Sequence, residues 1–175
     1  MKKIKILVLL FMILGLSCSE DEPITEGIFI SLNVKISLTD QQGLDLLDPN
    51  NQNAINSDNI KIFHMIDGEL KEFSEYLMDD SKGYRIYNPT ELGFNENYVF
   101  YLGSTSASYY THEEEEPITY IQWNETDMDT VRCQYQYSSN SIICTKVWFN
   151  ENVVWDMDDS EANSSRWFQI VKTIQ

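Results

Sequence analysis

Apolar and polar residues alternate along much of the chain. Every second residue from Ile28 to Leu38 is aliphatic, and this period of two is typical of a strand that buries one face. Further short runs rich in β-branched and aromatic residues predict more strands. They lie over residues 59–66, 69–73, 84–87, 98–102, 118–123, 130–137, 142–149, 153–155 and 167–174. No helical stripe of useful length accompanies these runs, so the pattern predicts an all-β protein.

One segment fits two structures. Asp67-Gly68 lies between two apolar runs, and both positions of a tight hairpin turn favour residues that tolerate positive φ. The apolar residues over 69–78 also recur three and four positions apart, as they do on a helix. We favour the hairpin, because the turn signal stands directly between the two runs. Residues 44–51, by contrast, have the composition of a loop with a small apolar plug.

The number and spacing of the strands favour two packed sheets. Roughly nine short strands, with a turn signal about every 8–12 residues, are typical of a sandwich rather than a wide barrel. Gly83, Tyr84 and Ile86 follow a strand, a turn and a second strand, and this order resembles the start of transthyretin-like and carboxypeptidase-regulatory-like modules. The resemblance implies an immunoglobulin- or transthyretin-like antiparallel β-sandwich of roughly seven to nine strands over residues 27–175. Such modules are usually non-catalytic.

The beginning of the chain has a different composition. Lys2, Lys3 and Lys5 precede an apolar run from Ile6 to Leu16. As a helix this run would span roughly 16 Å, about half the hydrocarbon thickness of a bilayer. It is too short for a permanent membrane span, so residues 1–17 are predicted to be a cleaved secretory signal peptide.

The segment Gly15-Leu16-Ser17-Cys18 resembles a bacterial lipobox. The resemblance implies that Cys18 is acylated and attaches the protein to a membrane through its lipid. The residues that follow resemble the acidic export signal of surface lipoproteins of the Bacteroidetes, namely Ser19, Glu20, Asp21 and Glu22. Residues 18–26 are then a lipidated tether on the outer membrane, with the protein facing the cell exterior. Two alternatives stay open: an ordinary signal peptide with a chance cysteine, and an acidic linker that leaves the protein on the periplasmic face.

The charge balance limits the kinds of partner that the protein can bind. The chain has 28 acidic residues against 12 basic ones, a net charge of -16. Such a field repels nucleic acid and anionic lipid headgroups, so we expect neither as a partner. Aromatic residues make up 13% of the chain and apolar residues 42%, which is too much for a disordered acidic tail. The composition therefore predicts a folded, strongly acidic domain.

Cys133 and Cys144 are the two cysteines that remain after lipidation of Cys18. If Tyr137–Asn140 is the loop that joins their strands, the two residues face each other directly, at a Cα separation that a disulfide tolerates. Outside the cytosol such a pair tends to oxidise. We therefore expect a Cys133–Cys144 disulfide, with two free thiols as the alternative.

The sequence carries few groups suited to catalysis or metal binding. His64 and His112 are the only histidines, and neither GxSxG nor HExxH occurs. We therefore expect a protein that is not an enzyme and needs no cofactor. Two acidic runs, 124–129 and 156–161, place oxygen atoms at alternate positions, as calcium sites do, although solvated loops explain both runs. The calcium candidates of the second run are Asp156, Asp158 and Ser160.

Aromatic and hydroxyl side chains suggest two further features. Trp123 and Trp155 are candidates for a flat platform on which sugar rings stack, with core filling as the alternative, because large aromatics on strands are usually buried. Thr130, within Asp129-Thr130-Val131, resembles the O-glycosylation sequon of exported Bacteroidetes proteins.

Three functions stay open at this point. We expect a lipid-anchored, non-catalytic binding or scaffold module at the cell surface, with an unknown protein or glycan ligand. The first alternative is a glycan-binding accessory of outer-membrane polysaccharide uptake, and the second is a small fimbrial or appendage-type subunit. Residues 44–50, 121–123 and 146–155 also resemble small uncharacterised surface lipoproteins of the Bacteroidetes. That resemblance implies a location and supplies no activity.

Overall fold

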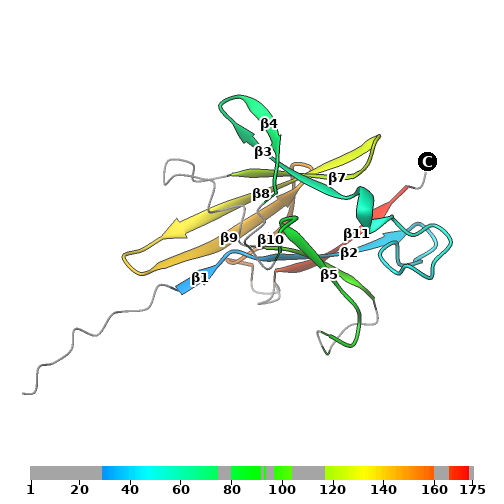
Figure 1. Cartoon of the computed structure of the whole chain (residues 1–175). Helices are drawn as coiled ribbons and strands as arrows, with labels where there is room; N and C mark the ends of the chain where they lie inside the picture. The colour runs from blue at the N-terminus through cyan, green and yellow to red at the C-terminus, as the bar shows by residue number, and fades with distance from the viewer. Residues whose placement is uncertain are drawn as a thin grey trace, which may run out of the picture.

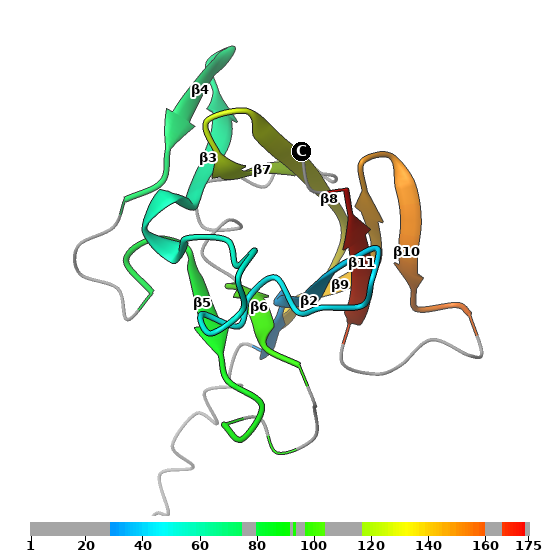
Figure 2. The same cartoon turned by 90° about the vertical axis from the view of Figure 1, so that its right-hand side faces the viewer.

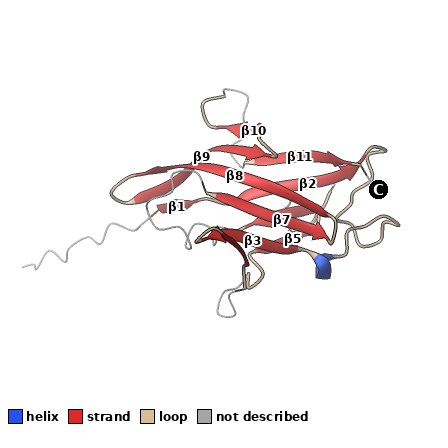
Figure 3. Ribbon diagram, turned by 90° about the horizontal axis from the view of Figure 1, so that it is seen from above, coloured by secondary structure: helices blue, strands red, loops and turns tan. Residues whose placement is uncertain are grey.

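The structure is a computed structural model of the chain, and it describes residues 29–74, 80–91, 93, 97–103, 117–159 and 166–173. The predicted signal peptide (1–17) and tether (18–26) lie outside the described residues. The described part is built almost wholly of strands, with one short 3-10 helix, η1 (Ser57–Asn59) (Figure 3). No helix in this part of the chain is long and apolar enough to cross a membrane.

Two sheets pack face to face around a common core (Figure 1). The large sheet has the strand order β1-β9-β8-β7-β3-β4, and β10 also pairs with β9. Its strands are β1 (Phe29–Ser31), β3 (Lys61–Ile66), β4 (Glu69–Glu72), β7 (Ile118–Asn124), β8 (Asp127–Tyr137), β9 (Ser141–Phe149) and β10 (Asn152–Asp156). The small sheet has the order β11-β2-β6-β5. Its strands are β2 (Val34–Asp40), β5 (Tyr84–Tyr87), β6 (Val99–Leu102) and β11 (Trp167–Lys172). The predicted all-β sandwich is confirmed.

The sheets are mixed rather than purely antiparallel. β1 runs parallel to β9, and β11 runs parallel to β2, whereas the other strand pairs are antiparallel. The two parallel pairs join segments from opposite ends of the chain, which local sequence patterns do not reveal.

The single strand predicted over 28–38 is instead two strands. The first strand ends at Ser31 and the second begins at Val34, so that β1 joins the large sheet and β2 joins the small one. Arg166 holds the crossing point, because its Nε donates to the Asn33 carbonyl at 2.7 Å and its Nη2 donates to Ser31 Oγ at 2.8 Å. The alternation continues across the break, so the pattern alone does not show the change of sheet.

The connection between β3 and β4 is the predicted hairpin. Asp67 and Gly68 adopt φ angles of 55° and 79°, as a two-residue turn of this kind requires. The helix considered over 69–78 does not form in its described part, because Glu69–Glu72 pairs with β3.

The core lies between the sheets, and aromatic rings bridge them. The ring centroid of Phe100, from the small sheet, lies 4.9 Å from that of Trp123 in the large sheet. Tyr84 stacks on the same phenylalanine, also at 4.9 Å. Leu46 and Leu47, the predicted apolar plug, are buried in the same cluster. They fasten the loop between β2 and β3 to the sandwich.

One end of the sandwich brings together segments from distant parts of the sequence. Figure 2 looks onto this end, where the loop after β2 passes in front of the sheets and β11 runs toward the C-terminus. The turn between β7 and β8 lies here as well, because β11 and this turn are joined through Lys172 and Asp127. This is the end of the molecule where a pocket forms.

Candidate functional site

The pocket at this end encloses about 580 Å³. Its walls come from residues 53–59 of the loop before β3, from the β7–β8 turn, from the end of β9 and from the end of β11. Volumes of about 300–1,000 Å³ are typical of small-molecule sites. The pocket is therefore the candidate functional site.

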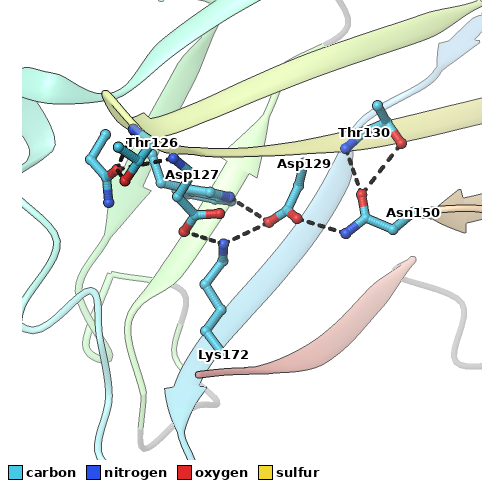
Figure 4. Close-up of polar contacts among 8 residues, drawn as sticks. Thr126, Asp127, Asp129, Thr130, Asn150 and Lys172 are labelled. Atoms are coloured by element: carbon cyan, nitrogen blue, oxygen red, sulfur yellow. Dashed lines mark hydrogen bonds and ion pairs between the residues drawn. The ribbon is translucent and has the colours of Figure 1, made fainter. Parts of the chain in front are cut away.

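Lys172 lies at the base of the pocket because of the strand period. Phe168 and Ile170 pack against the core, and Lys172 is the next residue on the same face of β11. Only 11% of its side chain is exposed, and its Nζ lies 2.6 Å from Asp127 Oδ2 and 2.8 Å from Asp129 Oδ2 (Figure 4). The two carboxylates offset the cost of burying an ammonium group.

Asp129 is the centre of the polar network. Its Oδ2 accepts a hydrogen bond from Trp123 Nε1 at 2.7 Å and forms an ion pair with Lys172, and its Oδ1 accepts a hydrogen bond from Asn150 Nδ2 at 2.6 Å (Figure 4). The ammonium also lies 5.3 Å from the centroid of the Trp123 ring, a cation–π distance. Both carboxylate oxygens thus have donors, which is how a buried charge is satisfied.

Two asparagines fix the turns that carry these carboxylates. Asn124 Oδ1 accepts the backbone N–H groups of Thr126 at 2.9 Å and Asp127 at 3.0 Å, which closes the β7–β8 turn. Asn150 has a φ of 46°, a left-handed conformation that asparagine tolerates well. Its Oδ1 accepts the N–H of Thr130 at 2.9 Å, so the same side chain joins β8 and the β9–β10 turn.

The loop before β3 forms the facing wall. Its backbone is tied down where the Ile55 N–H donates to the Leu46 carbonyl at 2.8 Å. Asn56 Oδ1 accepts the N–H of Asp58 at 3.0 Å and caps η1. Leu46 is buried beneath this wall. Contacts with the core and the cap of η1 therefore fix this wall of the pocket, although the wall belongs to a loop.

The chemistry of the pocket suits recognition. Its two carboxylates and one ammonium are bound to one another, with one negative charge in excess. Asparagine and threonine side chains make up most of the remaining polar lining. Among the described lining residues no nucleophile is paired with a general base, which is the arrangement that covalent catalysis needs.

The two tryptophans proposed as a sugar-stacking platform are in the core. Trp123 is fully buried, and Trp155 is 7% exposed. Neither offers an open ring face, so the platform prediction is wrong for both and the core alternative is confirmed. Trp123 still lines the pocket, and it contributes its indole N–H to Asp129.

The two cysteines are buried and free, and the predicted disulfide is not seen. Cys133 faces Val147, whereas Cys144 faces Tyr135, because the register shifts at a bulge in β9. The strands are joined by a tighter turn than the loop predicted over 137–140. A hydrogen bond between the two thiols raises the pKa of Cys133, and burial raises it further. The same hydrogen bond lowers the pKa of Cys144, against the opposite effect of burial.

In the described residues, neither acidic run forms the loop of oxygen ligands considered from the sequence. Residues 124–129 lie in the β7–β8 hairpin. Asp156 Oδ2 lies 2.6 Å from Lys146 Nζ, and its Oδ1 accepts the N–H of Asp158 at 3.1 Å. The hydrogen bond from Lys146 lowers the pKa of Asp156. Ser160 lies outside the described residues, and the described residues hold no cluster of three or more acidic, histidine or cysteine side chains able to bind a metal.

The candidate O-glycosylation residue lies beside the polar network. The Thr130 hydroxyl is 3.4 Å from Asn150 Oδ1, and the side chain is half-buried on β8 (Figure 4). The lipidation site and the export signal lie outside the described residues, namely Cys18, Ser19, Glu20, Asp21 and Glu22. His112 lies outside them as well.

The central residues of the pocket were missed from the sequence, although a signal exists. Lys172 is in phase with Phe168 and Ile170, at a position where the alternation demands an apolar side chain. Asp129 is likewise in phase with Val131 on β8. Two opposite charges at inward positions of two strands therefore predict a buried ion pair. Asn53, Asn56, Asn59 and Asn124 line the pocket and are here called the rim asparagines. They carry no such signal, since polar loop residues are usually solvated.

Comparisons with known proteins complete the description of the site. No family model, no curated protein and no solved structure matches this chain.

Proposed function

We propose that this protein is a lipid-anchored surface module that binds a ligand without catalysis, and that the pocket is its binding site. The observation that carries the proposal is the network of Asp127, Lys172 and Asp129 at the base of the pocket. Buried ion pairs seldom stabilise a fold more than apolar residues of similar volume would. Their position beneath a pocket therefore favours a role in recognition.

The leader supports the anchoring part of the proposal. A lipobox-like segment ends at Cys18, and the acidic residues after it support display on the cell exterior. One acyl chain binds a membrane only marginally, whereas two or more hold a protein firmly. The net charge of -16 keeps the folded part away from anionic headgroups. The lipid would then place the pocket near the membrane without inserting the domain.

The appendage alternative has less support. A subunit that accepts a donor strand needs a long edge strand with unpaired backbone groups. The edge strands of the two sheets are short: β1 has three residues, β4 and β5 have four each, β10 has five and β11 has six. Short edges of this kind favour a module that remains separate.

The anchor is tested by replacing its acceptor cysteine. The Cys18→Ala protein should move from the detergent phase to the aqueous phase when cells are extracted, because the thiol that carries the lipid is gone. Ser17→Ala is the matched control, since it keeps a small residue before the cysteine. Retention of Cys18→Ala in the detergent phase would contradict the anchor. Protease digestion of intact cells separates the exterior from the periplasmic face.

The binding site is tested on the detergent-solubilised full chain. Isotope-labelled protein should show shifts of the Trp123 indole N–H and of the rim asparagine amides when polar fragments are added. These groups line the pocket, so bound fragments change their magnetic surroundings. A fragment library that leaves all of these signals in place would contradict the pocket as a binding site.

A further inference from the structure

We propose that the ligand of the pocket is a neutral saccharide of one or two rings, bound by side-chain amides at the rim and by a carboxylate at the base. This inference rests on the pocket being a binding site, as proposed above. Three properties of the lining support it: charge, hydrogen-bonding capacity and aliphatic surface.

The charge of the pocket selects against ionic ligands. The Lys172 ammonium is held at 2.6 Å and 2.8 Å by Asp127 and Asp129, so an anionic ligand must compete with two carboxylates that are already in place. A cationic ligand is attracted by the one negative charge in excess and repelled by the ammonium beside it, so the two effects oppose each other. A neutral ligand leaves both ion pairs intact and avoids the cost of separating buried charges.

The rim offers amide groups that the fold does not use. Within the described residues, the side chains of Asn53 and Asn59 make no hydrogen bond, although both line the pocket. Asn56 and Asn124 use Oδ1 to accept backbone N–H groups, and their Nδ2 groups make no hydrogen bond within that same part of the chain. An amide donates through Nδ2 and accepts through Oδ1, and a sugar hydroxyl does both. Four asparagines around one rim therefore complement hydroxyl groups that point in several directions.

The base adds a stronger acceptor. Asp127 Oδ2 is bound to Lys172, whereas its Oδ1 has no hydrogen-bond partner among the described residues. The side chain is 37% exposed, so this oxygen is within reach of the pocket. A hydroxyl that donates to a carboxylate forms one of the stronger hydrogen bonds in proteins. One such bond at the base, with amides around it, fixes the orientation of a polyhydroxylated ring.

Aliphatic side chains complete the lining. Ile55 and Val171 both line the pocket, and Val171 is 61% exposed. The C–H faces of a sugar ring pack against such surfaces, which gives the ligand an apolar contact without an aromatic platform. Trp123 acts indirectly, because its ring is buried and its indole N–H holds Asp129. Recognition thus depends on hydrogen bonds at the rim rather than on stacking.

The experiment compares ligands that share a ring and differ in charge. The solubilised full chain is titrated with neutral hexoses, N-acetylhexosamines and their disaccharides, alongside glucosamine as a cation and glucuronate as an anion. Amide and indole shifts report on the pocket, and calorimetry gives the affinity. At least one neutral sugar should bind and shift the rim signals, and it should bind more tightly than the charged probes do.

Rim variants connect the binding to the named residues. The double variant Asn53→Ala/Asn59→Ala should weaken binding of the neutral sugar about tenfold or more, since each change removes hydrogen bonds to the ligand. Its midpoint of unfolding should stay unchanged, because these side chains make no hydrogen bond in the described part of the fold. Gln136→Ala is the matched control, since it removes an exposed amide of β8 outside the pocket. It should leave the affinity unchanged.

The outcomes separate this inference from the proposed function. If no sugar in the panel binds while polar fragments shift the pocket signals, the saccharide inference fails and the binding site stands. The saccharide inference also fails, and the binding site stands, if glucosamine or glucuronate binds more tightly than the neutral sugars do. The same holds if the rim variant leaves sugar binding unchanged. If neither sugars nor fragments shift the pocket signals, both proposals fail.

Discussion

The ammonium of Lys172 lies 2.8 Å from Asp129 Oδ2, and only 11% and 10% of these two side chains are exposed. Lys61 and Glu72 form an ion pair of nearly the same length, 2.9 Å, with 46% and 47% exposed. The two pairs share their chemistry and differ in burial. Water screens the second pair and supplies new partners if it breaks, whereas the first has few alternatives.

Replacing Lys172 should therefore be severely destabilising. Lys172→Met keeps most of the side-chain volume and leaves the Asp129 carboxylate buried beside Asp127 without a cation. We expect the free energy of unfolding to fall by about 3–5 kcal/mol, as when one partner of a buried pair is removed. Urea denaturation followed by tryptophan fluorescence measures this change.

The matched control is Lys61→Met on the exposed pair. It should cost less than about 1 kcal/mol, because exposed pairs contribute little. Equal losses in the two variants would show that the interior around Asp129 is as well solvated as the surface. Adding Asp129→Asn to Lys172→Met should recover part of the lost stability, because the uncompensated charge is then removed.

Two glycines with the same backbone conformation should respond differently to alanine. Gly83 and Gly43 have φ angles of 80° and 83°, so both substitutions carry the cost of about 1–2 kcal/mol of a left-handed residue with a Cβ. A Cβ on Gly83 would lie 2.9 Å from Phe73 Cδ1, whereas one on Gly43 has no neighbour within 4 Å. Gly83→Ala should therefore cost roughly 1–3 kcal/mol more than Gly43→Ala. Chemical denaturation of both variants tests the difference, and equal losses would contradict the packing of Phe73 against this turn.

His64 should make the fold sensitive to mild acid. It lies at an inward position of β3, and burial lowers its pKa from 6.5 to about 4. Between these two values the unfolded chain binds a proton at this residue and the folded protein does not. Stability is therefore complete above pH 6.5 and falls as the pH drops toward about 4. The loss attributable to His64 should be ~3 kcal/mol.

Comparing the unsubstituted protein with a His64 variant separates the effect of His64 protonation on stability from that of carboxylate titration. The free energy of unfolding of the unsubstituted protein and of His64→Gln is measured from pH 7 down to pH 4. The gap between the two curves should change by the predicted amount, since the other titrating groups are common to both. The same substitution at His112, the only other histidine, gives the contribution of that residue. A constant gap for His64→Gln would contradict its low pKa.

The sequence allowed the elements of the fold to be predicted because period-two runs and turn residues act locally. The Asp67-Gly68 turn and the strand Tyr84–Tyr87 appear where the pattern placed them. The change of sheet after Ser31 was not predictable in this way. It depends on Arg166, which lies 135 positions away from Ser31 along the chain. The parallel pairing of β11 with β2 depends on the same kind of distant contact.

The candidate site was less accessible to sequence reasoning than the fold. Trp123 was predicted, as one of two alternatives, to be an exposed ring for sugar stacking. An apolar position on a strand indicates only that its side chain faces either the core or a partner. The inward phase of Lys172 and Asp129 was present in the sequence, and pairing them required the two sheets to be placed together. The rim asparagines reach the pocket because the loop before β3 packs over Leu46, and this packing has no signature in the local sequence.

Cys133 and Cys144 should remain thiols, even though both face the interior. Each is paired with another residue across the β8–β9 ladder, so they are diagonal neighbours. Diagonal positions have Cα atoms about 7–8 Å apart, beyond the range of about 4.4–6.8 Å in which disulfides form without backbone movement.

Thiol counting tests this prediction directly. Protein unfolded in denaturant without reductant should take up two maleimide groups per chain beyond any at Cys18, which Cys18→Ala removes from the count. The native protein should react slowly, because Cys133 is 5% and Cys144 is 1% exposed. Cys133→Ala should lower the number of maleimide groups in the unfolded protein to one per chain beyond any at Cys18. This variant shows that the probe can react with Cys144 when Cys133 is absent. No labelling before reductant is added would contradict the prediction, because it would show that the two neighbouring sulfur atoms are joined in a disulfide.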